Sequence, residues 1–148
     1  MHDYTQNFIM PLAIAVITSY LTVKLSIRQF CSQKWWEKKS EAYSHIIEQL
    51  SRLKYFFREW SGTIEESKKL GLEFQKKLHE EYMEAEKEII KAAASGSYII
   101  SEEGTNALEK LLTELAQKDQ LKDVLDNHDS VKNCITEIRK FARKDLKL

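Results

Sequence analysis

The sequence predicts an all-α fold, in which an N-terminal transmembrane helix continues into a cytoplasmic antiparallel bundle of about four helices. Composition is the first indication, because the 148 residues include one proline, four glycines and long stretches of Glu, Lys, Leu and Ala, which lose little freedom in a helix. The others are an apolar run at residues 8–23 and apolar repeats after it. We therefore expect a transmembrane anchor with its flank, residues 1–29, and a cytoplasmic helical bundle, residues 30–148.

The apolar run FIMPLAIAVITSYLTV, residues 8–23, is the predicted anchor, and no charged residue occurs from Tyr4 to Val23. A helix of about 20 residues rises about 30 Å, the thickness of the hydrocarbon layer of a bilayer. A signal peptide or a buried core helix is the alternative. A signal peptide begins with positive charge, whereas His2 and Asp3 precede this run. The pattern therefore favours an uncleaved anchor.

Charged residues around the run predict its orientation. Lysines and arginines follow it and none precedes it, which places the C-terminal part of the chain in the cytoplasm. Tryptophan also favours the headgroup region, although Trp36 has an alternative role as the first core residue of the bundle. The predicted membrane-interface residues are Lys24, Arg28, Trp35 and Trp36, and the lipid bilayer is the first expected partner.

A stripe of small and hydroxyl residues follows one face of the predicted span. Ala15, Ser19, Thr22 and Ser26 recur at spacings of four, three and four, and such stripes let membrane helices approach closely. They are the predicted helix-packing residues of a homo-oligomer. The alternative is that the hydroxyls bond to carbonyls of their own helix.

Helical periodicity continues beyond the span. One predicted helix runs to Trp60 and ends at Ser61–Gly62, after which Thr63 and Glu66 form a capping box for the next helix. The second helix is predicted to end at Gly96 in a left-handed conformation.

The third and fourth helices are predicted after Ser101, which is placed as an N-cap. The third continues loosely through Leu121, Val124 and Leu125, and the sequence DNHDS, residues 126–130, is read as a turn before the fourth. The predicted bundle core is Leu50, Leu53, Phe57, Phe74, Leu78, Leu111, Leu115 and Ile138.

No motif for catalysis or for a cofactor is found, so the protein is expected to be non-enzymatic, with no cofactor and no metal. Glu-x-x-His and His-Glu-x-x-His patterns are absent, and residues 126–129 are ordinary turn residues. Residues 61–119 hold eight Lys/Arg against thirteen Asp/Glu. That excess of acid argues against a nucleic-acid partner. Cys31 and Cys134 lack metal-site spacing, and Cys134 is assigned to the core.

Three stretches carry a resemblance: KWWEKKSEAYSHIIEQLSRLKYFF at residues 34–57, SGSYIISEE at residues 95–103 and ARKDLKL at residues 142–148. With them the chain resembles an uncharacterised family of bacterial proteins with one N-terminal span and a small helical domain. The layout is also similar to HEPN-like membrane accessory proteins of RNA-targeting CRISPR systems, which form oligomeric pores. These resemblances imply a bacterial inner-membrane location, and they identify no site.

The leading hypothesis is a bacterial inner-membrane protein that self-associates and acts as a membrane effector or adaptor, with pore formation in antiphage defence as one form. The first alternative is a tether that presents the bundle to a cytoplasmic protein partner. The second is a divergent HEPN-like ribonuclease. It is disfavoured because no histidine follows an arginine at the four-to-six-residue spacing of that class.

Overall fold

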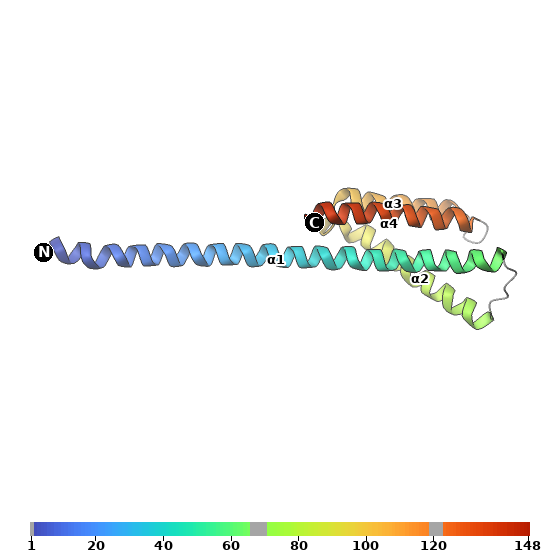
Figure 1. The fold of residues 1–148 in the computed structure, drawn as a ribbon, viewed down its shortest axis with the longest axis horizontal. Coiled ribbons are helices and arrows are strands. Elements are labelled where there is room, and N and C mark those ends of the chain that lie inside the picture. The colour runs from blue at the N-terminus through green and yellow to red at the C-terminus, as the bar shows by residue number, and fades with distance from the viewer. Residues whose placement is uncertain (1, 66–70, 119–122) are drawn as a thin grey trace. The chain divides into compact units, whose positions relative to one another are not determined.

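A computed structural model describes residues 2–65, 71–118 and 123–148 of the chain (Figure 1). These residues form α1 (His2–Glu65), α2 (Leu72–Ser95), the 3-10 helix η1 (Gly96–Tyr98), α3 (Glu102–Gln117) and α4 (Val124–Leu146). The predicted all-α class with four helices is confirmed. The chain divides into two compact units, the residues up to Glu37 and Lys38–Leu148, whereas the predicted domain boundary follows residue 29.

Within the second unit, α1 and α2 run in opposite directions. His45 on α1 lies 3.5 Å from Glu88 near the end of α2. The ring of Phe56, further along α1, lies 4.6 Å from the tilted ring of Tyr82, which comes earlier on α2. Later positions on α1 therefore meet earlier positions on α2.

The helices α3 and α4 are antiparallel by the same reasoning. Lys144, at the end of α4, contacts Glu103 at the start of α3. Cys134, earlier on α4, donates a hydrogen bond to the carbonyl of Ala107, which comes later on α3. Short connections between successive helices favour this arrangement, and Figure 1 shows the alternating directions.

The core of the second unit is built from side chains of α1, α2, α3 and α4. The core includes an aromatic group, in which the Phe56 ring is 5.2 Å from Phe57 and 4.6 Å from Tyr82. Tyr43 is also buried. Seven of the eight residues predicted for the core are buried: Leu50, Leu53, Phe57, Leu78, Leu111, Leu115 and Ile138.

Phe74 is the exception, and its assignment to the core is wrong, because 40% of its surface is exposed. Phe74 lies in the first turn of α2, and the buried face of that helix begins one turn later at Leu78. In Figure 1 the N-terminal end of α2 lies apart from the other helices. The apolar spacing is correct, but the helix has not yet reached the core at this position.

Two predicted features at the end of the first cytoplasmic helix are also corrected. Ser61–Gly62 does not end α1, which continues to Glu65. A single glycine weakens a helix by only about 1 kcal/mol, so neighbouring residues can offset this cost and the helix continues past Gly62. Thr63 lies inside α1 and therefore does not cap the next helix, and Glu66 lies outside the described residues.

Gly96 ends α2 in a right-handed conformation, with φ −64° and ψ −30°, and the predicted left-handed cap is wrong. The chain turns directly into η1, where the N–H groups of Ile99 and Ile100 both donate to the Gly96 carbonyl. A Cβ atom at Gly96 would lie 3.1 Å from Ile100 and 3.2 Å from the Thr105 hydroxyl. The side chains of Ile100 and Thr105 would have to shift by a few tenths of an ångström to admit a Cβ atom, so the packing here is close.

The turn between the last two helices lies earlier than predicted. The α3 helix ends at Gln117, α4 already begins at Val124, and residues 126–130 are helical. Leu121 lies outside the described residues. Asn127 is fully buried, so tertiary packing overrides the turn preference of this segment. Ser101 does cap α3, with its hydroxyl accepting a hydrogen bond from the Gly104 N–H.

Candidate functional site

The N-terminal part of α1 is an apolar helix with exposed side chains. It is the one helix, among the described residues, that is long and apolar enough to cross a membrane, and none of its apolar window is buried. Large apolar side chains from Met10 to Phe30 are exposed, Leu12 by 67% and Leu21 by 51%. The window is therefore not a core helix of the bundle. A membrane anchor and a signal sequence both fit these properties.

The predicted helix-packing residues, Ala15, Ser19, Thr22 and Ser26, lie on one exposed face of α1, because successive residues of a helix are rotated by about 100°. The Thr22 hydroxyl donates a 2.8 Å hydrogen bond to the carbonyl of Thr18 on its own helix. The alternative interpretation of the stripe therefore holds for this hydroxyl. What Thr22 offers to a neighbouring helix is therefore a small side chain that permits close packing.

Three of the predicted interface residues, Lys24, Arg28 and Trp35, lie on the face of α1 opposite this stripe, about 150–170° away by helical geometry. The Lys24 ammonium is 6.0 Å from the centre of the Tyr20 ring. Trp36, which is 46% exposed, lies between this face and the stripe, about 80° from Arg28. The first unit therefore presents two different faces, one small and one cationic.

Lys34 differs from the two preceding cations because it has an acidic partner. Its ammonium lies 2.8 Å from the carboxylate of Glu37, and this hydrogen bond holds the pKa of Glu37 below its ordinary value. Neither Lys24 nor Arg28 forms an ion pair with any residue of the described ranges 2–65, 71–118 and 123–148.

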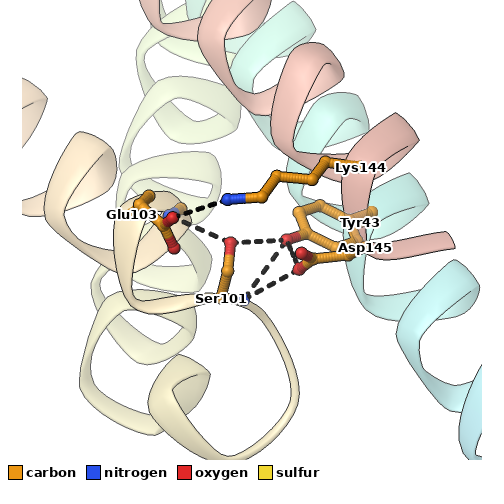
Figure 2. Close-up of polar contacts among 6 residues, drawn as sticks. Tyr43, Ser101, Glu103, Lys144 and Asp145 are labelled. Carbon is orange, nitrogen blue, oxygen red and sulfur yellow. Dashed lines mark hydrogen bonds and ion pairs between the residues drawn. The ribbon is translucent and has the colours of Figure 1, made fainter. Parts of the chain in front are cut away.

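A polar cluster joins three helices of the second unit (Figure 2). The Tyr43 hydroxyl of α1 donates a hydrogen bond to the Asp145 carboxylate of α4. The same carboxylate accepts the backbone N–H of Ser101 at 3.0 Å. Because the single hydroxyl proton of Tyr43 goes to Asp145, the Ser101 hydroxyl, 3.2 Å away, is the donor to the Tyr43 oxygen. Asp145 thus supplies an anion beside the N-terminus of α3, where the helix dipole favours it.

Burial raises the pKa of the Tyr43 hydroxyl, and its hydrogen bond to Asp145 adds to this effect. Beside the cluster, Lys144 and Glu103 form an exposed ion pair at 2.9 Å. This contact lowers the pKa of Glu103 and raises that of Lys144. The cluster fastens the start of α3 to α1 and α4, and its buried hydroxyl is held in the neutral form.

A small hollow of about 190 Å³ lies between α1, the end of α2 and the segment after η1. His45, Glu88 and Lys91 line it together with apolar side chains. The Lys91 ammonium, 2.6 Å from Glu88, holds the pKa of that carboxyl below its ordinary value. The volume of this hollow is below the roughly 300 Å³ at which ligand pockets usually begin, so we assign no ligand to the hollow.

No metal site is found in residues 2–65, 71–118 and 123–148: no group of three or more His, Cys, Asp or Glu side chains is arranged to hold an ion. His128 lies 3.5 Å from Asp129 in the first turns of α4. Cys134 is buried and Cys31 is exposed.

Comparison with known proteins gives no match, neither to a family model, nor to a curated protein sequence, nor to a solved structure. The resemblance to bacterial membrane proteins stays a prediction. Each of the three stretches that carry it contributes one residue to the polar cluster, namely Tyr43, Ser101 and Asp145. The cap at Ser101 is predicted from the sequence, and the spacings of three and four from Tyr43 to Ile46 and Leu50 place Tyr43 on an apolar helix face. No sequence feature singles out Asp145.

Proposed function

We propose that this protein is a non-enzymatic, single-pass protein of the bacterial inner membrane, which self-associates through its N-terminal helix and acts as a membrane effector or adaptor. Pore formation in antiphage defence is one form of such an effector. The observation that carries the proposal is the exposed, uncharged apolar surface of α1 from Met10 to Val23. The bundle would lie in the cytoplasm, as the positive charges after the span favour.

Exposed apolar surface of this extent supports a membrane location. Soluble monomers rarely expose apolar patches larger than a few hundred Å², and each 100 Å² left in water forgoes roughly 2.5 kcal/mol. A bilayer covers such a helix completely, and the helix satisfies its own backbone hydrogen bonds there. The exposed apolar side chains from Met10 to Phe30 extend about 30 Å.

The stripe of Ala15, Ser19, Thr22 and Ser26 supports self-association. Membrane helices gain little from the hydrophobic effect on meeting one another, so they associate where small side chains permit close packing. The Thr22 hydroxyl is hydrogen-bonded to its own helix. We therefore assign the contribution of Thr22 to self-association to the small size of its side chain and not to a hydrogen bond between helices.

The second candidate function is a tether for a cytoplasmic protein partner, and one surface of α2 favours it. Met83 and Ile90 lie two turns apart on the same side of α2, and each is 50% exposed. Two exposed apolar side chains at this spacing are typical of a helix that receives a partner. In this case the membrane helix would serve only to hold the bundle at the membrane.

Two matched leucine variants distinguish the effector from the tether. Ala15→Leu enlarges the stripe, whereas Ala13→Leu makes the same change about 200° away on the same helix. Ser19→Leu with Thr22→Leu is the stronger variant of the stripe. Oligomer size after detergent extraction and membrane permeability on induction are measured for each protein.

The effector proposal expects an oligomer for the wild-type protein and for Ala13→Leu, with smaller particles and less leakage for the stripe variants. A monomeric wild type, or stripe variants that assemble and permeabilise equally well, would leave the tether as the better account. A C-terminal reporter that is active only outside the cytoplasm would overturn the orientation in both cases.

A further inference from the structure

A shallow groove runs along one side of α1 after the apolar segment. Leu25, Arg28, Ser32 and Trp36 line it, together with two glutamines. The four residues follow one another at spacings of three and four, which places them on one helix face. From one end to the other, the groove offers an apolar side chain, a guanidinium, a hydroxyl and an indole ring.

The position of this groove along the helix matches the depth of phospholipid headgroups. If the hydrocarbon layer of about 30 Å covers the exposed apolar side chains from Met10 to Phe30, Arg28 lies at the edge of that layer. Lys24, about one turn further in, then extends its flexible stem so that its ammonium reaches toward the headgroups. Ser32 then lies one turn further out, about 6 Å along the axis. Leu25 remains within the layer, where acyl chains lie.

Charge in this segment favours an anion. No Asp or Glu occurs between Tyr4 and Trp36, and the first acid after this range, Glu37, pairs with Lys34. No carboxylate of the described residues therefore competes with a ligand for the Arg28 guanidinium. An arginine at this depth can also bind a phosphate with two parallel N–H groups.

We propose that this groove binds one anionic phospholipid, whose phosphate is held by the Arg28 guanidinium and the Ser32 hydroxyl. The acyl chains lie along Leu25, and the headgroup lies against Trp36, whose indole favours this region. The inference rests on the proposed membrane location. It does not depend on self-association, because the groove is complete on one helix.

The test uses the full-length protein in phosphatidylcholine vesicles that contain increasing amounts of brominated phosphatidylglycerol. Bromine quenches the fluorescence of nearby tryptophans, and Trp35 is a second tryptophan of the predicted membrane interface. All proteins therefore carry Trp35→Phe, so that Trp36 reports occupancy while Trp60 in the bundle gives a constant background. Arg28→Gln is compared with Lys34→Gln, which removes the same charge six residues away. Arg28→Lys keeps the charge but removes the fork of parallel N–H groups.

Arg28→Gln should raise the half-saturating fraction of phosphatidylglycerol about tenfold, because a hydrogen bond to a charged group contributes at least that much. Lys34→Gln should change it by less than about twofold, since that exposed cation is already paired. The half-saturating fraction for Arg28→Lys should lie between those for Arg28→Gln and Lys34→Gln.

Equal weakening by Arg28→Gln and Lys34→Gln would overturn the site, because it would indicate diffuse attraction by net charge. So would equal quenching by brominated phosphatidylcholine, or displacement of the lipid by inorganic phosphate. Alkaline extraction of the same vesicles tests the membrane location separately. A wild-type protein that is washed out refutes the proposed function together with the inference, whereas retained protein without lipid preference refutes the inference alone.

Discussion

The Tyr43 hydroxyl on α1 donates a hydrogen bond to the Asp145 carboxylate at the end of α4, 102 residues further along the chain. The backbone N–H of Ser101 at the start of α3 donates to the same carboxylate. A single carboxylate therefore holds three helices of the bundle together. Because Tyr43 is only 1% exposed, water does not replace this bond easily when one partner is removed.

Removal of this hydrogen bond should destabilise the bundle. Tyr43→Phe is expected to lower the free energy of unfolding by about 1.5–3 kcal/mol, the usual range for a hydrogen bond to a charged group. Asp145→Ala should act similarly, and the double variant should lose less than the sum, because both changes break one contact. Denaturant unfolding followed by circular dichroism measures this. Additive losses would show that the two residues act separately, and Lys144→Gln is the exposed control on the same helix.

The raised pKa of Tyr43 predicts a loss of stability in alkaline solution. An unfolded tyrosine ionises near pH 10, whereas the folded protein keeps Tyr43 neutral to a higher pH. The contribution of the neutral Tyr43 hydroxyl to the free energy of unfolding is therefore fully present below about pH 10. It is lost as the pH rises through the pKa of Tyr43 in the folded protein. Melting temperatures around this pH should fall more steeply for the wild type than for Tyr43→Phe. Tyr98→Phe, at a position that is 83% exposed, should keep the wild-type slope.

Two phenylalanines test the core as the structure places it. Phe57 is fully buried and Phe74 is 40% exposed. Phe57→Ala should lower the free energy of unfolding by about 3–5 kcal/mol, and Phe74→Ala should lower it by less than about 1 kcal/mol. A comparable loss in the free energy of unfolding for both variants would contradict the exposed position of Phe74 and would indicate that it packs in the core.

The two cysteines should differ in reactivity. Burial raises the pKa of the Cys134 thiol to about 12, and the negative charges of Glu137 and Glu114 contribute to this shift, so little nucleophilic thiolate forms at neutral pH. Cys31 is exposed. A maleimide should therefore label Cys31 in the folded protein and should label Cys134 only after unfolding, as read by mass spectrometry of the peptides. Rapid native labelling of Cys134 would contradict its burial.

The helices and most of the core follow from the sequence, because apolar spacings of three and four leave few alternatives in a chain with one proline. Helix ends are harder to predict. Residues 126–130 have turn-forming composition, yet burial of Asn127 keeps them helical. Gly96 marks a close approach to Ile100, which depends on a segment folded back against it. Local pattern does not contain such information.

The polar cluster shows the same limit for the candidate sites. Ser101 is recognisable as an N-cap because caps are local, whereas the pairing of Tyr43 with Asp145 depends on the meeting of α1 and α4. The exposed apolar helix and the stripe along it are the opposite case, since helical geometry alone places their side chains. That is why the central claim about self-association can be tested directly on this helix.

Disulfide crosslinking in isolated membranes tests that claim most directly. Ser26 lies on the stripe, whereas Cys31 lies about 140° away on the same exposed helix. Ser26→Cys combined with Cys31→Ser should give a crosslinked dimer on mild oxidation, because the stripe brings the two copies together. The wild-type protein, with its native Cys31, should crosslink far less, and the buried Cys134 should not contribute. Equal crosslinking of the variant and the wild type, or no crosslinked dimer of the variant, would contradict self-association through this face.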